Sequence, residues 1–204
     1  MGYRSDLTLA LYVADALAAL RGPAVSVSRI DADQRRNPGL YAVFGSASTW
    51  KQLRLGAPPD DRPLYVGKAE KTLAARDVQD HFGAGRREAQ SPTGSSTLRR
   101  SLAALLAAER GYRGVPRNPD NPGYFSCYGL SIEHDEDLSQ WMARRLRLAL
   151  WPQSGVKLAT IETAVLIELV PPLNIEKVVT PWRRQVKTAR AVLTREARAW
   201  RPQR

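Results

Sequence analysis

Two short stretches, Gly39-Leu40-Tyr41-Ala42-Val43-Phe44 and Leu64-Tyr65-Val66-Gly67-Lys68-Ala69, decide how the rest of this chain is arranged. Both are runs of aromatic, aliphatic and β-branched residues bounded by glycine or proline, which is typical of β-strands. Because they are neighbours in the sequence, we predict that they pair as a hairpin. Side chains alternate across a sheet, so Tyr41 and Tyr65 can project from one face into a shared site.

Later residues follow the two strands in a characteristic order: Arg76, His81, then Glu162 in an apolar helical stretch, then Pro171 and Asn174. With the two tyrosine strands, this order resembles the signature of the GIY-YIG nuclease superfamily. In that family a metal-binding glutamate lies on a helix that is followed by a proline and an asparagine. The resemblance covers residues 39–82 and 124–176.

The resemblance implies an α/β fold of the layered α+β kind, with a small mixed three-stranded sheet flanked by helices. We expect an N-terminal helix and approach segment at 1–38 and a nuclease domain at 39–176 with insertions at 45–62 and 83–123. A basic C-terminal helix would follow at 177–204. The resemblance does not reach the first 38 residues, the insertions or the C-terminal helix.

Hydrophobic periodicity and turn residues predict the remaining elements. Helices are expected at 7–21 with Asp6 as N-cap, and at 70–82, 95–110, 135–151, 160–170 and 181–200. Strands are expected at 25–30 and 124–132. In the loop at 45–62, residues 50–54 can form one helical turn, and such a basic aromatic insertion is a candidate recognition element. A loop tryptophan such as Trp50 more commonly packs on the body of the protein.

The resemblance also assigns roles at the site. Glu162 is the expected ligand for Mg²⁺ or Mn²⁺, because such hard cations prefer oxygen donors and can be held by one carboxylate plus a substrate phosphate. Tyr41 is the expected general base, and Tyr65 a second phenol that orients the water or the phosphate. For Tyr41, the alternative is a core tyrosine with a wet hydroxyl.

Arg76 is the expected phosphate clamp, since a guanidinium offers paired donors to a phosphoryl group, and Arg99 is its fallback. His81 would donate to a nonbridging oxygen or shuttle a proton, unless it is a satisfied, partly buried imidazole. Lys68 and Asn174 are supporting residues, and the asparagine amide would fix the glutamate helix to the sheet.

The net charge of +11 points to a polyanionic partner, since each neutralised phosphate releases condensed counterions. Residues 181–204 carry eight Lys or Arg and one Glu, so +7 of the +11 lies there. An apolar stripe in this segment would dock on the body and turn the cations to DNA. The expected DNA-binding residues are Arg99, Arg100, Arg183, Arg184, Lys187 and Arg190; a solvated basic face is the alternative.

Cys127 is the single cysteine, which excludes an intramolecular disulfide and fits a reducing cytoplasm. The other possible nitrogen or sulfur ligands are His81 and His134, and together with Cys127 they lack the paired spacing of a structural zinc site. The apolar stretch near the N-terminus is too short to span a bilayer, so no membrane association is expected.

The sequence therefore favours a Mg²⁺-dependent endonuclease that cuts double-stranded DNA, of the restriction or mobile-element kind. Two alternatives stay open: a structure-selective repair nuclease, and a catalytically silent nucleic-acid-binding protein that has kept the fold. Retention of Tyr41, Tyr65, Arg76 and Glu162 together argues against silence, because binding alone does not need this combination. Monomer and homodimer are both open.

Overall fold

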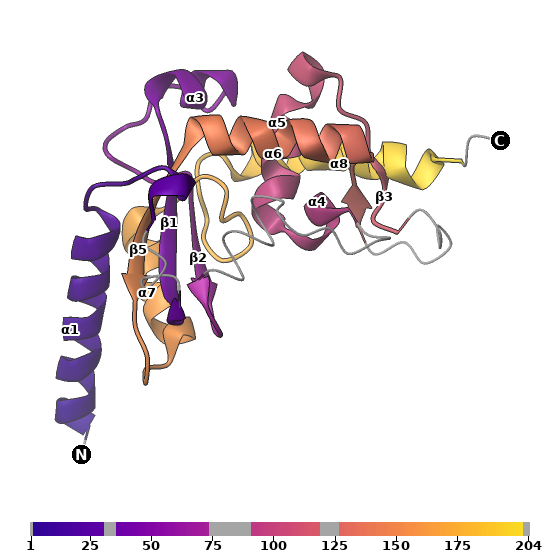
Figure 1. Cartoon of the computed structure of the whole chain (residues 1–204). Helices are drawn as coiled ribbons and strands as arrows, with labels where there is room; N and C mark the ends of the chain where they lie inside the picture. Colours follow the sequence, from indigo (N-terminus) through magenta and orange to yellow (C-terminus); the bar gives the residue numbers. More distant parts are fainter. Residues whose placement is uncertain (1, 31–35, 74–90, 119–126, 202–204) are drawn as a thin grey trace.

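The computed structural model describes residues 2–30, 36–73, 91–118 and 127–201. Its centre is a sheet of three strands, with helices packed on both faces (Figure 1). The predicted fold class, a small three-stranded sheet flanked by helices, is confirmed.

The two signature stretches form β1 (Gly39–Gly45) and β2 (Tyr65–Ala69), which pair antiparallel as predicted. The third strand is β5 (Leu146–Pro152), and the strand order is β2-β1-β5. Its ladder with β1 is also antiparallel, so the sheet is antiparallel where a mixed one was expected. This leaves β2 as an edge strand.

The position of the third strand corrects the sequence prediction. The sequence pattern predicts residues 146–151 as the end of a helix, but α6 (Ile132–Arg145) stops at Arg145 and the chain continues directly into β5. In Leu146-Arg147-Leu148 the leucines are buried and the arginine is exposed, which is the alternation of a strand. The predicted strand at 124–132 contributes only β4 (Tyr128–Gly129), which pairs with β3 (Val115–Pro116) outside the main sheet.

One face of the sheet packs against α1 (Gly2–Leu20) and α7 (Leu158–Leu169). Both helices were predicted, but α1 already begins at Gly2, so Asp6 is not its N-cap. The expected strand at 25–30 is reduced to a single bridge between Val25 and Leu148, followed by the 3-10 helix η1 (Val27–Arg29).

The opposite face packs against α3 (Ala47–Gln52), α5 (Thr97–Arg110), α6 and α8 (Arg183–Ala199). The short helix α4 (Pro92–Ser95) leads into α5, whose N-cap Ser96 accepts a hydrogen bond from the Arg99 N–H at 3.1 Å. Helix α5 ends at Gly111, which has a φ of 69°. The predicted inner face of this helix is confirmed, because Leu98, Leu102, Leu105 and Leu106 are buried.

Trp50 of α3 is fully buried and lies edge-on against Trp182, with 5.6 Å between the ring centroids. The Trp182 indole N–H donates to the Leu55 carbonyl at 2.8 Å. The loop at 45–62 is therefore held against the start of α8. This agrees with the interpretation that Trp50 packs on the body of the protein and does not serve recognition. As predicted, α8 docks by an apolar stripe in which Val186 and Leu193 are buried.

None of the helices in the described ranges is long and apolar enough to cross a membrane.

Candidate active site

The two tyrosines lie on one face of the hairpin, as the alternation of side chains predicted. Tyr41 is paired across the strands with Gly67, and Tyr65 with Val43. Their ring centroids are 6.2 Å apart with an angle of 39° between the planes. The strand register itself therefore brings the two phenols together.

Tyr41 is 1% exposed, and its phenol lies directly over Gly67 of the neighbouring strand. A Cβ at position 67 would be 2.3 Å from the Tyr41 hydroxyl oxygen and 2.4 Å from Cζ. Real Cβ atoms do not approach other atoms so closely, so Gly67 is the residue that permits this arrangement. Gly67, which follows Tyr65 on β2, thus leaves the space that the Tyr41 ring occupies.

Tyr65 is half-buried and lines a pocket of about 210 Å³ at the edge of the sheet. Side chains from β2, α5, α7 and the segment after α7 meet there: Tyr65, Lys68, Thr97, Glu162, Asn174, Ile175, Glu176 and Lys177. Four of the predicted site residues, Tyr65, Lys68, Glu162 and Asn174, are therefore brought together. Tyr41 packs behind Tyr65 and is not part of this lining.

Glu162 is 3% exposed although it carries a carboxylate. Its neighbours Ile161 and Val165 pack α7 onto the sheet, and this fixes the turn of the helix from which Glu162 reaches the pocket. Glu162 Oε2 accepts a hydrogen bond from Lys177 Nζ at 2.6 Å. A buried carboxylate needs such a cationic or hydrogen-bonding partner to offset the loss of hydration.

Asn174 ties the chain after α7 to the edge of the sheet. Its amide oxygen accepts from the Val66 N–H at 2.9 Å, and its amide nitrogen donates to the Val66 carbonyl at 2.7 Å. The Leu173 N–H also donates to the Leu64 carbonyl at 3.0 Å. These bonds satisfy the outer edge of β2 and fix the glutamate helix to the sheet, as expected for this asparagine.

Lys68 follows Gly67 on β2, and its ammonium pairs with the carboxylate of Glu70. The lysine is half-buried and borders the same pocket as Glu162 and Lys177. Two ammonium groups, Lys68 and Lys177, and two carboxylates, Glu162 and Glu176, therefore line the pocket together with the phenol of Tyr65.

The family model of the GIY-YIG catalytic domain matches residues 46–192. The chain belongs to the GIY-YIG nuclease superfamily. The matched span begins just after β1 and ends within α8, so it includes Tyr65, Glu162 and Asn174. Comparison with curated proteins and with solved structures gives no significant match.

The oxygen donors of this GIY-YIG site suit a hard divalent cation. Glu162 and Glu176 supply carboxylates and Tyr65 a phenol, all on the same pocket. Within the ranges that the structure describes, no three or more His, Cys, Asp or Glu side chains are grouped to hold a metal ion. The residues therefore fit Mg²⁺ or Mn²⁺ held by one carboxylate together with waters and a substrate phosphate, rather than an all-protein cage.

Two residues assigned from the GIY-YIG signature, Arg76 and His81, lie outside the described residues. Their positions relative to the pocket stay predictions.

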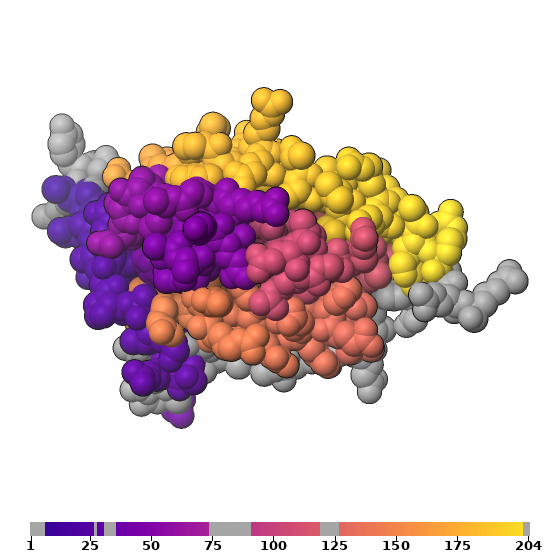
Figure 2. Space-filling model, turned by 90° about the horizontal axis from the view of Figure 1, so that it is seen from above, coloured from indigo at the N-terminus to yellow at the C-terminus, as the bar shows by residue number. Residues whose placement is uncertain are grey.

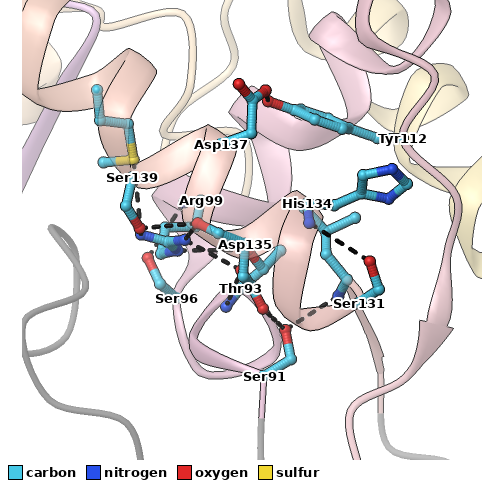
Figure 3. A network of polar contacts seen from close by, with 12 residues as sticks. Ser91, Thr93, Ser96, Arg99, Tyr112, Ser131, His134, Asp135, Asp137 and Ser139 are labelled. Carbon is cyan, nitrogen blue, oxygen red and sulfur yellow. Dashed lines mark hydrogen bonds and ion pairs between the residues drawn. The ribbon is translucent and has the colours of Figure 1, made fainter.

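The predicted roles of Arg99, as a DNA contact and as the fallback phosphate clamp, are wrong. Its side chain is fully buried between α5 and α6 (Figure 3). The guanidinium donates to Asp135 Oδ1 at 3.0 Å, to the Asp135 carbonyl at 2.9 Å and to Ser139 Oγ at 3.0 Å. Burial lowers the pKa of Arg99, and the Asp135 carboxylate opposes that shift.

Asp135 in turn accepts hydrogen bonds from the hydroxyls of Ser91 and Thr93, as Figure 3 shows. The ion pair thus anchors the segment that leads into α5. Arg100, the next residue, is half-buried and donates to Thr97 Oγ1 at 3.2 Å. Its assignment to DNA stays a prediction.

The structure adds two charged residues that sequence reasoning missed, Glu176 and Lys177. They lie in a turn-rich segment without periodicity, so no pattern marks them. The available signal was their distance from Asn174, two and three positions along the chain. Once Asn174 is fixed at the edge of β2, the residues after it must lie near the glutamate helix.

The cations of α8 divide between two faces of the helix. Lys187 and Arg190 line a groove of about 420 Å³ together with Ile175, Glu176, Ala191, Thr194, Arg195 and Arg198. This groove shares Ile175 and Glu176 with the active-site pocket. Arg184 lines a separate groove between α5 and α8, and Arg183 is half-buried. Two of the four predicted α8 residues thus adjoin the site, and Arg195 and Arg198 join them.

Proposed function

We propose that this GIY-YIG protein is a Mg²⁺-dependent endonuclease that hydrolyses phosphodiester bonds of double-stranded DNA. One observation carries the proposal: the buried carboxylate of Glu162 and the phenol of Tyr65 face the same pocket of about 210 Å³ beside two lysines. This set combines groups for metal binding, water activation and phosphate binding. Family membership supports a nuclease independently.

In this proposal the tyrosine pair removes the proton from the attacking water. A free phenol has a pKa of about 10 and is a weak base at neutral pH, but neighbouring cations favour its ionised form. Lys68 and Lys177 line the pocket with Tyr65, and so do the carboxylates of Glu162 and Glu176, which oppose ionisation of the phenol, so this role also needs the charge of a bound divalent cation. This placement supports Tyr65 as the phenol that meets the water, with Tyr41, the residue expected for that role, packed behind it and holding its ring.

The charge that grows on the phosphoryl oxygens needs neutralisation. A divalent cation bound through Glu162 supplies it when present, as a Lewis acid at those oxygens. Lys68 lines the pocket and would donate to a nonbridging oxygen after leaving its pair with Glu70. The family resemblance adds Arg76 as phosphate clamp and His81 as the group that donates to a nonbridging oxygen or shuttles a proton.

DNA reaches the pocket along α8 in this proposal. Figure 2 shows α8, in yellow, on the outer surface of the molecule. Lys187, Arg190, Arg195 and Arg198 line the groove that continues from the pocket. One carboxylate, Glu176, lines the same groove and lies 3.9 Å from the Lys187 ammonium. The excess of cations suits a row of backbone phosphates, which would bind without sequence preference.

Incubation of the purified protein with supercoiled plasmid tests the activity. Nicked or linear product should form with Mg²⁺ or Mn²⁺ and not with EDTA. Cleavage that persists in EDTA would contradict the metal assignment. Binding of DNA without any cleavage would instead favour a catalytically silent binding protein.

Phenylalanine substitutions then assign the base. Tyr65→Phe removes the hydroxyl at the pocket, so the cleavage rate should fall by about 10² or more, the scale of general-base catalysis. Tyr41→Phe should have the smaller effect. The reverse order would return the base to Tyr41, and two unchanged rates would place it elsewhere.

A further inference from the structure

The carboxylate proposed to bind the metal ion makes an ion pair with a lysine. Lys177 Nζ lies 2.6 Å from Glu162 Oε2. In the described part of the chain, this is the ion pair that Glu162 makes. Since metal binding at Glu162 is itself a proposal, the inference developed from this pair rests on the proposed function.

The two partners differ in how firmly they are held. The Glu162 side chain is 5% exposed and belongs to the packed helix α7, whereas the Lys177 side chain is 49% exposed and extends from a turn. A lysine has a flexible four-carbon stem and a strongly hydrated ammonium, so Lys177 can leave the pair and regain water. Glu162 cannot leave, because its helix packs against both the sheet and α1.

A buried carboxylate without a nearby cation destabilises the folded protein, because its charge has lost its hydration without compensation. Lys177 therefore offsets the burial of Glu162. A divalent cation bound to the same carboxylate would satisfy the same charge, and the ammonium and the ion repel each other at this distance. The two cations are thus alternatives at Glu162.

We propose that Lys177 is a built-in competitor of the metal ion, which holds the Glu162 carboxylate until a divalent cation displaces it. The released ammonium stays at the pocket mouth, where Lys68 already lies, and adds a second positive charge for a DNA phosphate. Metal binding at Glu162 would then also strengthen the attraction of the site for its substrate.

Lys177→Met tests the proposal, because methionine keeps much of the stem and removes the charge. Mn²⁺ binding to the DNA-free protein is measured by calorimetry. The matched control is Lys68→Met, which removes an ammonium from the same pocket that pairs with Glu70 and not with Glu162. We expect Lys177→Met to tighten Mn²⁺ binding about tenfold or more, since the displaced contact is a charge-assisted hydrogen bond, and Lys68→Met to change it about threefold or less.

Lys177→Arg is the second variant, and it keeps the proposal testable if Lys177→Met does not fold. It retains a cation opposite Glu162, so its Mn²⁺ affinity should stay near that of the unaltered protein. Thermal melts add an independent readout: Lys177→Met should melt lower without metal, and saturating Mn²⁺ should raise its melting temperature more than that of the unaltered protein.

Equal or weaker Mn²⁺ binding by Lys177→Met would overturn the competition, because the ion would then share the carboxylate with Lys177. Glu162→Gln separates this failure from failure of the proposed function. If Glu162→Gln abolishes Mn²⁺ binding while Lys177→Met leaves it unchanged, only the competition is wrong. If the unaltered protein binds no Mn²⁺ without DNA, the competition is wrong, whereas the proposed function is decided separately by plasmid cleavage with Mg²⁺ or Mn²⁺ and its loss in EDTA.

Discussion

Replacing Arg99 by methionine should make the protein much easier to unfold, although the change lies away from the groove proposed to bind DNA. The Arg99 side chain is fully buried and the Asp135 side chain is 5% exposed. Methionine fills much of the arginine stem volume, so the main loss is the positive charge beside a buried carboxylate. Removing one member of such a pair costs about 3–5 kcal/mol.

Urea unfolding followed by tryptophan fluorescence measures this cost. At a slope of about 2 kcal/mol per M urea, a loss of 3–5 kcal/mol lowers the midpoint by about 1.5–2.5 M. Arg100→Met is the matched control, because Arg100 lies in the same turn of α5 but is half-buried and donates to Thr97 rather than to a buried carboxylate. Its midpoint should change by about 0.5 M or less, as expected for a substitution away from a buried network.

The same two variants distinguish structure from DNA binding. Arg99→Met should leave the dependence of DNA affinity on salt concentration unchanged, under conditions in which it is folded. An unchanged urea midpoint together with a flatter salt dependence would refute the buried-pair account and restore Arg99 to the DNA surface.

Three further outcomes follow from the geometry. Gly67→Ala places a methyl group against the Tyr41 phenol, so the free energy of unfolding should fall by about 1–3 kcal/mol and cleavage should weaken. Adding Tyr41→Leu to this variant should recover part of the stability. If the stability losses of the two single variants simply add in the double variant, the clash is not their cause. Asn174→Ala leaves both backbone groups of Val66 without their partners, at about 1–3 kcal/mol each, and an unchanged urea midpoint would contradict the role of the amide. Changing the groove cations Lys187, Arg190 and Arg195 to glutamine should flatten the slope of log affinity against log salt by roughly two to three units, at about 0.9 per phosphate. Arg184→Gln, on the other face of the helix, should leave the slope nearly unchanged. Equal slopes for the triple variant and the unaltered protein would show that DNA does not bind in this groove.

The hairpin and the glutamate helix could be predicted from the sequence because their signals are local. Turn residues bound β1 and β2, alternation places both tyrosines on one face, and Pro171 follows the end of α7. Asn174 also behaved as the resemblance implied. The strand and helix signals depend on residues within a few positions of one another, whereas the bonds of Asn174 join it to Val66, 108 positions away, and were expected from the resemblance alone.

The misplaced third strand shows where local signals fail. Leu146 and Leu150 continue the helical spacing of Leu138 and Met142, but with Leu148 they also fit the alternation of a strand. Only pairing with β1, about 100 residues away in the sequence, decides for a strand after Arg145. The burial of Arg99 depends likewise on Asp135 in another helix. An arginine near the start of a helix looks like an anion-binding residue until its long-range partner is known.

The most direct test of the account compares two glutamates of α7. Glu162→Gln keeps the shape of the side chain and removes its charge at the pocket, whereas Glu168→Gln makes the same change at an exposed position of the same helix. Cleavage of a labelled DNA duplex is followed with Mg²⁺ in single-turnover experiments, and binding of the same duplex is measured in parallel. We expect Glu162→Gln to slow cleavage by about 10² or more while it still binds the duplex, and Glu168→Gln to cut at nearly the unaltered rate. Cleavage by Glu162→Gln at the rate of the unaltered protein would contradict the assignment of the active site.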